Sequence, residues 1–268
     1  MVEKNKKIER YHMQDKTPYS ANVIEPPISI SDTHHTKHIK KNNHQKIFTG
    51  IPEYLESVYY WSYLNPRNVN FLDREWIVKA ILWWQHAKLR NTAFYEIQPG
   101  GKVLQTAAVY GNFSSALADY LGSEGQLTVL DVAQIQVYIT HKKLSKHLNT
   151  EVMLSDASQH QISQDTNVIL SYFLLHEVPD DYKQKILDNL LSQLPIGAKL
   201  VLLDYHKPHW AHPLKPLMSM IFDTLEPFAK SFWEKDISHF SKVRNDFNWE
   251  KSTLFGGLYQ KVVVTRKQ

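Results

Sequence analysis

The stretch GKVLQTAAVYGNFSSALADYLGSEGQLTVLDVAQIQ, Gly101–Gln136, decides the fold that this sequence predicts. A short apolar run begins at Val103 and ends in small residues, and Gly111 opens a helical segment over 114–121. A second apolar run then ends at Asp131. This order of strand, turn, helix, strand and acid is typical of a βαβ nucleotide-binding unit, in which the acid accepts hydrogen bonds from ribose hydroxyls.

The turn after the first predicted strand resembles motif I of the class I S-adenosylmethionine (SAM) methyltransferases in an altered form. That family places an acid before Gly-x-Gly-x-Gly. Here Gln105 replaces the acid, Ala107 and Val109 replace the first two glycines, and only Gly111 remains. Tyr110 adds bulk beside that glycine. The pattern indicates either SAM bound in an altered pose or a pocket that has lost SAM.

Further along the chain, apolar runs alternate with helical patterns, which favours a parallel sheet covered on both faces. Strands are predicted over 151–156, 167–173, 199–204 and 259–265, and a helix over 181–194. We expect an α/β, Rossmann-like class I methyltransferase fold with a mostly parallel seven-stranded sheet. Ligands of such sheets bind at the carboxyl ends of the strands. The polar residues at or just beyond those ends are Tyr110, Asp131, Asp156, Tyr172, His176, Glu177, Asp204 and His206.

Three regions of different composition are visible along the chain. Residues 1–47 are polar and rich in Lys and Asn, which predicts a disordered tail. Residues 48–98 predict an N-terminal helical layer, and residues 99–268 a SAM-binding domain with a helical lid insertion over 209–248. The tail contains His34, His35, His38 and His44, which either bind a metal or belong to a solvated tail; the second interpretation is favoured because no scaffold is evident.

The N-terminal layer is rich in aromatic residues. Ile51–Leu64 is predicted to be helical, and Phe71–Leu89 is predicted to form one amphipathic helix because its apolar residues recur at three- and four-residue steps. Tryptophans and nearby basic residues in the second segment favour either packing against the sheet or a pocket, or contact with a membrane interface.

Composition and charge exclude several classes of protein. The chain has 268 residues, 43% of them hydrophobic, and no cysteine, which predicts a globular protein of a reducing compartment. A net charge of +4 is too small to argue for a nucleic-acid partner. No apolar run reaches the ~18 residues of a membrane span, and the start MVEKNKKIER is unlike a secretory signal. We therefore expect a cytoplasmic protein.

Five segments of the chain carry a more specific resemblance. They are VLQTAAVYG from Val103, VLDVAQIQ from Val129, FLLHEVPDD from Phe173, LLDYHKP from Leu202 and FGGLYQKVVVTR from Phe255. Together they resemble the RquA family of rhodoquinone-biosynthesis proteins, which are related to the quinone methyltransferases. The resemblance covers roughly residues 51–268. It implies conversion of ubiquinone to rhodoquinone, with an amino group replacing a ring methoxy group.

The resemblance also implies SAM as the amino donor, a divalent metal, expected to be Mn²⁺, and a place at the inner membrane surface. The candidate cofactor-binding residues are Gln105, Ala107, Gly111, Asp131 and Asp156, with Asp156 expected at the adenine amino group as in methyltransferase folds. The candidate catalytic residues are Tyr110, Tyr172, His176 and Glu177. His176, Asp204 and His206 form a candidate metal-ligand set of nitrogen and oxygen donors. Histidine can also take a proton near pH 7.

Gln105 bears on which group of SAM reacts. A carboxylate would favour the ammonium form of the SAM amino group, whereas only the neutral amine has the lone pair that an amino donor needs. Gln105 can equally be a tolerated polar replacement in a degraded pocket. Two other functions stay open: an ordinary SAM-dependent methyltransferase acting on a quinone or another small apolar molecule, and a catalytically inert partner of a quinone-biosynthesis complex.

Overall fold

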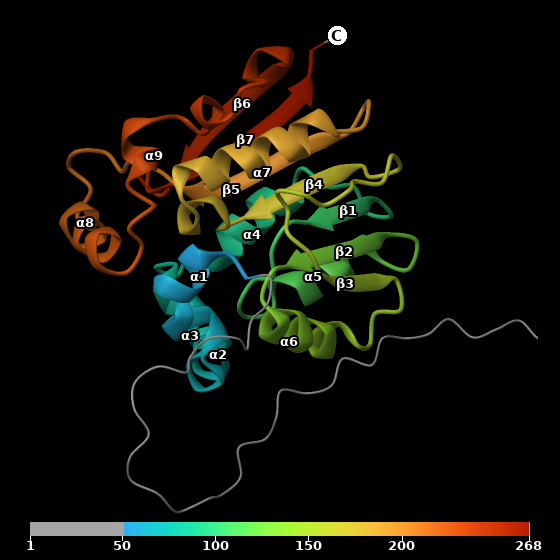
Figure 1. Ribbon diagram of the computed structural model, residues 1–268, viewed down its shortest axis with the longest axis horizontal. Helices are drawn as coiled ribbons and strands as arrows, with labels where there is room; N and C mark the ends of the chain where they lie inside the picture. Colours follow the sequence, from blue (N-terminus) through green and yellow to red (C-terminus); the bar gives the residue numbers. More distant parts are fainter. Residues whose placement is uncertain (1–50, 268) are drawn as a thin grey trace, which may run out of the picture. The chain divides into compact units, whose positions relative to one another are not determined.

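The computed structural model describes residues 51–267, whose helices and strands are labelled in Figure 1. The α-helices are α1 Glu53–Ser57, α2 Pro66–Leu72, α3 Glu75–Ile81, α4 His86–Phe94, α5 Phe113–Leu121, α6 Gln134–Leu144, α7 Asp180–Ser192, α8 Lys215–Thr224 and α9 Ser231–Glu234. The strands are β1 Lys102–Gln105, β2 Gln126–Asp131, β3 Thr150–Leu154, β4 Val168–Tyr172, β5 Lys199–Tyr205, β6 Phe247–Leu254 and β7 Tyr259–Arg266. A π-helical turn spans Tyr60–Leu64, and 3₁₀ turns span Leu175–Glu177, Ile237–Phe240 and Arg244–Asp246.

Seven strands of the described residues form one sheet in the order β3-β2-β1-β4-β5-β7-β6. The neighbours from β3 to β5 are parallel, whereas β7 is antiparallel to both β5 and β6. The strand order reverses between β1 and β4, and such a reversal leaves a crevice outside the carboxyl ends of the two strands. The predicted class I methyltransferase fold with a mostly parallel sheet is confirmed.

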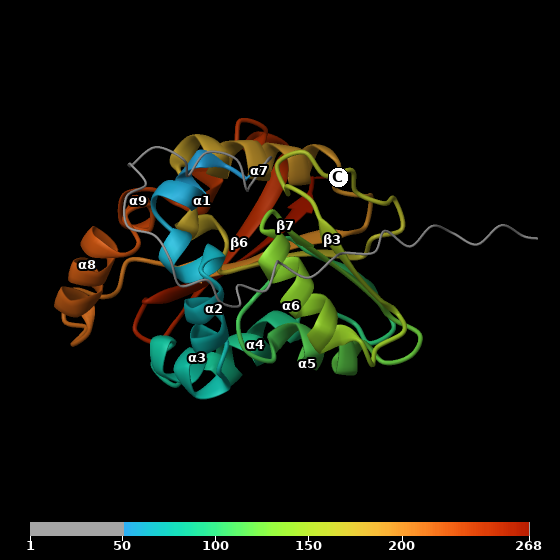
Figure 2. The same cartoon turned by 60° about the horizontal axis from the view of Figure 1, so that its bottom comes forward.

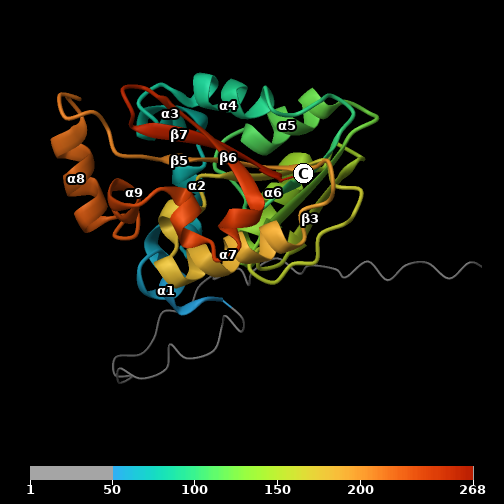
Figure 3. The same cartoon turned by 90° about the horizontal axis from the view of Figure 1, so that it is seen from above.

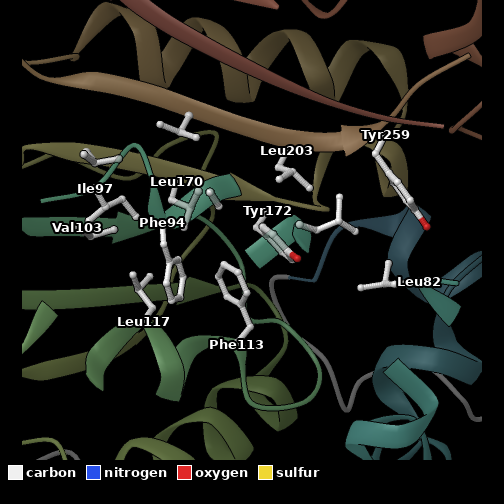
Figure 4. Packing of buried hydrophobic residues seen from close by; sticks show 14 of the residues in the cluster. Leu82, Phe94, Ile97, Val103, Phe113, Leu117, Leu170, Tyr172, Leu203 and Tyr259 are labelled. Carbon is white, nitrogen blue, oxygen red and sulfur yellow. The ribbon is translucent and has the colours of Figure 1, made fainter. Parts of the chain in front are cut away.

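Helices cover both faces of the sheet, as Figures 2 and 3 show from two directions. On one face α4 and α5 contribute Phe94, Phe113 and Leu117 to a core that includes Leu170 of β4 (Figure 4). On the other face α7 packs against alternate residues of the same strand, among them Ile169. Every residue of β4 is buried, which explains why its sequence is nearly continuously apolar.

The predicted single helix over Phe71–Leu89 is wrong. The chain forms α2, α3 and α4 instead, with a break after Leu82 in which Trp83 and Trp84 have φ angles of 50° and 58°. Bulky residues rarely adopt this left-handed region. Trp83 packs against the core, whereas Trp84 remains 71% exposed. The hydrophobic period continues across the break, so periodicity could not reveal it.

The insertion over 209–248 contains α8, α9 and two 3₁₀ turns, and β6 begins inside it. Its anchor is Lys183 of α7, which is fully buried. The Lys183 Nζ donates to the Phe228 carbonyl oxygen at 3.0 Å and to Asp180 Oδ1 at 2.9 Å. It also lies 5.3 Å from the ring centroids of Phe232 and Phe240. These contacts fix the insertion against α7, and its role as a lid stays a prediction.

The tail over 1–47, which the sequence predicts to be disordered, lies outside the described residues together with its four histidines. Within residues 51–267, the helices are all too short or too polar to cross a bilayer.

Leu170→Ala tests the two-faced core. Leu170 is fully buried in the central strand β4, and removing its side chain leaves a cavity between the sheet and α5. The free energy of unfolding should fall by about 2–5 kcal/mol, as measured by urea denaturation. Leu148→Ala, at a fully exposed position, should change it by less than about 0.5 kcal/mol. Equal losses in both variants would contradict this packing.

Candidate active site

A cavity of about 200 Å³ opens at the carboxyl ends of β1, β2 and β4. One side of its wall is the loop between β1 and α5 together with Asp131 and Asp156. The other side combines the N-terminal helices, the turn after β4 and Glu226 of the insertion. Six of the predicted cofactor and catalytic residues with polar side chains therefore share this wall, together with the small Ala107. They are Tyr110, Asp131, Asp156, Tyr172, His176 and Glu177.

Asp131 and Asp156 provide the acceptors of the first side. Asp131 Oδ2 accepts from the Ala108 N–H at 3.1 Å, and Oδ1 accepts from the Ala133 N–H at 2.7 Å. Burial raises the pKa of Asp131 to about 6, against the effect of these backbone donors. Asp156 Oδ1 accepts from the Ser158 N–H at 2.8 Å. A carboxylate has about four lone-pair positions, so both acids can accept further bonds, which fits the hydroxyl and amino donors of an adenosine.

Gln105 lies beneath the loop and is fully buried. Its Nε2 donates to the Ala107 carbonyl oxygen at 2.7 Å, and its Oε1 accepts from Ser114 Oγ at 3.0 Å. The amide therefore braces the turn between β1 and α5 instead of lining the cavity. A glutamate would place a carboxylate oxygen against the Ala107 carbonyl, so the geometry of this turn favours the amide.

Gly111 is bonded to the N-terminal layer and lies behind the cavity wall. Its φ is 77°, a conformation that favours glycine. The Gly111 N–H donates to Asp73 Oδ1 at 2.9 Å, while Lys143 forms an ion pair with Asp73 and donates to the Gly111 carbonyl oxygen at 2.9 Å. The N–H group of Gly111, the one glycine kept in the loop, is therefore already bonded to the Asp73 carboxylate of this chain.

Tyr110 makes the second link to the N-terminal layer. Its ring stacks on Tyr63 with centroids 5.4 Å apart and planes 2° from parallel. Its hydroxyl donates to the Ser62 carbonyl oxygen and accepts from Gln136 Nε2 at 3.1 Å. Tyr110 therefore closes one end of the cavity by holding the π-helical turn over the loop.

Two tyrosine–glutamate pairs line the opposite side. Tyr63 donates to Glu177 Oε1, and Tyr59 donates to Glu226 Oε2 at 2.7 Å. Burial raises the pKa of Glu177 to about 8, partly offset by His176, and burial also raises the pKa of Glu226. Burial thus shifts both carboxyl groups towards the protonated form, and the neighbouring His176 opposes this shift.

His176 lies between these acids and a third carboxylate. Its Nδ1 is 2.8 Å from Asp204 Oδ1, and its Nε2 is 3.7 Å from Glu177 Oε1. Burial alone would lower the pKa of His176, but the surrounding carboxylates Asp204, Glu177 and Glu226 raise it to about 9. The raised pKa favours the charged ring at neutral pH, so we expect His176 to take its proton above the pH near 7 that the sequence predicts.

The predicted metal-ligand set of His176, Asp204 and His206 does not fit a metal. The Asp204 carboxylate already accepts three backbone N–H bonds, from Leu175, His176 and Tyr205, and it also faces the His176 ring. These four partners occupy the lone-pair directions of the carboxylate, so none is left for a metal. The His206 ring is directed to the Gly257 carbonyl oxygen, 2.9 Å from Nδ1. Across residues 51–267, no three His, Asp or Glu side chains are grouped so as to hold an ion.

Sequence reasoning missed four residues of the site. Tyr59, Tyr63 and Glu226 form the tyrosine–glutamate pairs, and only the aromatic density around Tyr60 hinted at the first two. Phe173 follows β4 with a φ of 55°. Strained backbone of this kind concentrates at functional sites, but nothing in the sequence marks it. Phe173 lines the cavity beside Tyr172, whose ring stacks on Phe113 at 3.9 Å.

The order of the strands, together with Asp131 and Asp156 at the strand ends, is that of the class of SAM-dependent methyltransferases. Within that class, the ubiE/COQ5 methyltransferase family model matches residues 79–248, and the chain belongs to this family. The chain is 25% identical over 170 residues to a demethylmenaquinone methyltransferase of Lysinibacillus sphaericus, covering 61% of this chain and 69% of the relative. It is 23% identical over 160 residues to one of Staphylococcus epidermidis, covering 59% of this chain and 62% of the relative.

Solved structures agree on the fold. The mitomycin 7-O-methyltransferase MmcR has a TM-score of 0.59 at 14% identity, covering 78% of this chain and 60% of that one. Human N-acetylserotonin methyltransferase in complex with SAM has a TM-score of 0.53 at 13% identity, covering 82% of this chain and 61% of that one. At such identities the likeness extends to the fold alone.

Asp131→Ala tests the adenosine side of the cavity. SAM binding should weaken by roughly 1–3 kcal/mol because charge-assisted hydrogen bonds to the ribose are lost. Titration calorimetry measures this loss. In the unmodified protein, affinity should also decrease as the pH falls through about 6, where Asp131 gains a proton. Asp119→Ala, which removes an exposed carboxylate paired with His147, serves as control. Unchanged affinity in a folded Asp131→Ala protein would remove Asp131 from the site.

Glu177→Gln tests the buried proton. The folded-state pKa of Glu177 is raised from 4.5 to about 8, so the folded protein holds this proton more tightly than the unfolded chain. The associated stability is present below about pH 4.5 and is lost as the pH rises through about 8. The variant should therefore lose less stability than the unmodified protein across this window, as measured by urea denaturation at several pH values. Parallel pH profiles for the two proteins would show that folding does not raise the pKa of Glu177.

Proposed function

We propose that the protein transfers a group from SAM to the ring of a quinone. Membership of the ubiE/COQ5 methyltransferase family and the curated demethylmenaquinone methyltransferase relatives support this class of reaction and acceptor. The observation that carries the proposal is the cavity itself, because it joins an adenosine-compatible pair of acids to an aromatic chamber with a buried acid pair.

On the SAM side, Asp131 would hold the ribose hydroxyls and Asp156 the adenine amino group. SAM supplies the transferred group. The β1–α5 loop would contact the rest of SAM through Ala107 and Tyr110, which line the cavity. Tyr110, stacked on Tyr63, would set how deeply SAM enters.

On the acceptor side, the chamber offers both flat apolar contacts and one mobile proton. Tyr172, Phe173 and Tyr205 provide ring faces and edges. The Glu177–Glu226 pair can donate a hydrogen bond to a ring carbonyl or accept the proton of a ring hydroxyl. The fixed charge of His176, held by Asp204, would stabilise negative charge that develops on a ring oxygen.

The finer proposal is that the SAM nitrogen bonds to a ring carbon of ubiquinone and that the methoxy group on this carbon leaves as methanol. The bond between this nitrogen and the α-carbon of SAM then breaks by elimination, with a β-proton of SAM passing to the nitrogen, which gives rhodoquinone. The resemblance to the RquA proteins implies this reaction. In support, the position of the usual acid holds Gln105, whose amide is engaged with Ala107 and Ser114. It offers no negative charge to stabilise the ammonium form of SAM, so the reactive neutral amine is favoured. No step is assigned to a metal, because the predicted ligands do not fit one.

Methyl transfer is the second candidate, and membership of a methyltransferase family favours it. In that reaction one carboxylate of the Glu177–Glu226 pair would take the proton of a ring hydroxyl. Both reactions use the same cavity, so the distinction depends on which end of SAM faces the ring.

Doubly labelled SAM distinguishes the two reactions. The protein is supplied with ubiquinone and with SAM carrying nitrogen-15 in its amino group and carbon-13 in its methyl group, with and without added Mn²⁺. Amination predicts a quinone product that contains nitrogen-15 and no carbon-13, as measured by mass spectrometry. Asp131→Ala protein should form less of it.

A product with the carbon-13 label would establish methyl transfer instead and would contradict amination. No labelled product under either metal condition would favour an inert partner of a quinone-biosynthesis complex. Gln105→Glu is an unsuitable test of the missing acid, because the new carboxylate would face the Ala107 carbonyl and disturb the loop.

A further inference from the structure

The N-terminal layer leaves several large apolar side chains exposed, and two of them also line the cavity. They come from one continuous stretch of chain, residues 60–84, and we call them the apolar rim: Tyr60, Trp61, Phe71, Trp76, Ile81 and Trp84. Phe71 and Trp76 contact edge to face at 6.2 Å. Figures 1 and 2 show α2 and α3, which carry several of these residues, side by side.

Two residues of the apolar rim connect it to the site. Trp61 and Ile81 are 41% and 47% exposed, and both also line the cavity. Leu72 and Val78, from the same two helices, continue the cavity wall. An apolar molecule on the surface therefore reaches the chamber of Tyr172 and Glu177 along apolar side chains.

The charges around the apolar rim have one dominant sign. Residues 66–90 contain five basic side chains and two acidic ones. Arg67, Arg74 and Lys88 are exposed, and the Arg74 guanidinium lies 5.5 Å from the centre of the Phe71 ring. Both acids are engaged, Glu75 by Lys79 at 2.7 Å and Asp73 by Lys143. Exposed tryptophans with surrounding cations are the chemistry that binds an anionic lipid interface.

The backbone supports presentation of this surface. Trp84 has a φ of 58°, a strained value for tryptophan, and its side chain is 71% exposed. The turn at Trp83 and Trp84 interrupts the helix. It directs the Trp83 side chain towards the core and leaves the Trp84 side chain exposed. The same turn thus packs one tryptophan against the core and leaves its neighbour exposed together with the other members of the apolar rim.

We propose that the apolar rim docks on an anionic phospholipid bilayer and admits a lipid-dissolved acceptor directly into the cavity. The basic side chains attract the lipid phosphates, and the tryptophans enter the headgroup region. This inference rests on the proposed function only for the identity of the acceptor. The docking itself is a property of the surface and is measured without SAM or quinone.

Vesicle co-sedimentation of the full chain tests the docking. Vesicles of phosphatidylcholine with phosphatidylglycerol should bind the protein at low salt, and both high salt and pure phosphatidylcholine should weaken binding. Trp76→Ala combined with Trp84→Ala should reduce partitioning roughly tenfold or more, since burial of one large apolar side chain is worth about one decade of affinity. Circular dichroism and thermal unfolding establish that the variant is folded.

Tyr95→Ala is the matched control, because Tyr95 is 81% exposed and lies outside the apolar rim, beside Lys261. Its binding should equal that of the unmodified protein. Undiminished vesicle binding by the double tryptophan variant would overturn the proposal and trace binding to another part of the chain. If the unmodified protein does not bind vesicles, and the double tryptophan variant has a lower mass by light scattering, then a second copy of the chain covers this surface instead of a bilayer. Loss of amination in the label experiment leaves the docking result unaffected.

Discussion

Asp204 is a carboxylate buried at the end of β5, and the arrangement of the site depends on how its charge is satisfied. The N–H groups of Leu175 and His176, in the turn after the neighbouring strand β4, both donate to it. The charged His176 ring completes the set. Leaving such a carboxylate unpaired would be costly, so the turn is held in one conformation. That conformation points Glu177 into the cavity and leaves Phe173 with left-handed backbone.

The second constraint is closure of the cavity by the N-terminal layer. In the loop after β1, Tyr110 and Gly111 bind Ser62 and Asp73 of that layer. Tyr59 and Tyr63 of the same layer bind the two glutamates across the cavity. Tyr110, which stands beside the one glycine kept in the loop, thus has hydrogen-bond and stacking partners in the N-terminal layer. Tyr110 is a structural part of the closed chamber.

The site was predictable to the extent that it follows strand ends. Asp131 and Asp156 line the cavity because the carboxyl ends of parallel strands share one edge of the sheet. The same argument grouped His206 with His176, wrongly, because residues beyond a strand end are free to turn away; His206 turns to Gly257. Glu226 could not be predicted, since its place depends on how the insertion packs on Lys183.

The sequence by itself determined the parallel part of the sheet, because continuous apolar runs at regular intervals are typical of parallel strands covered on both faces. It gave no signal for β6, whose residues are mostly exposed. It also determined that β2 ends in an acid and that the loop after β1 lacks two of the usual glycines. Only the tertiary structure decided that Gln105 braces the loop, that His176 lies against Asp204, and that Glu177 and Glu226 share a chamber. These properties arise from distances between residues far apart in the chain and from exclusion of water, which no local pattern of residues records.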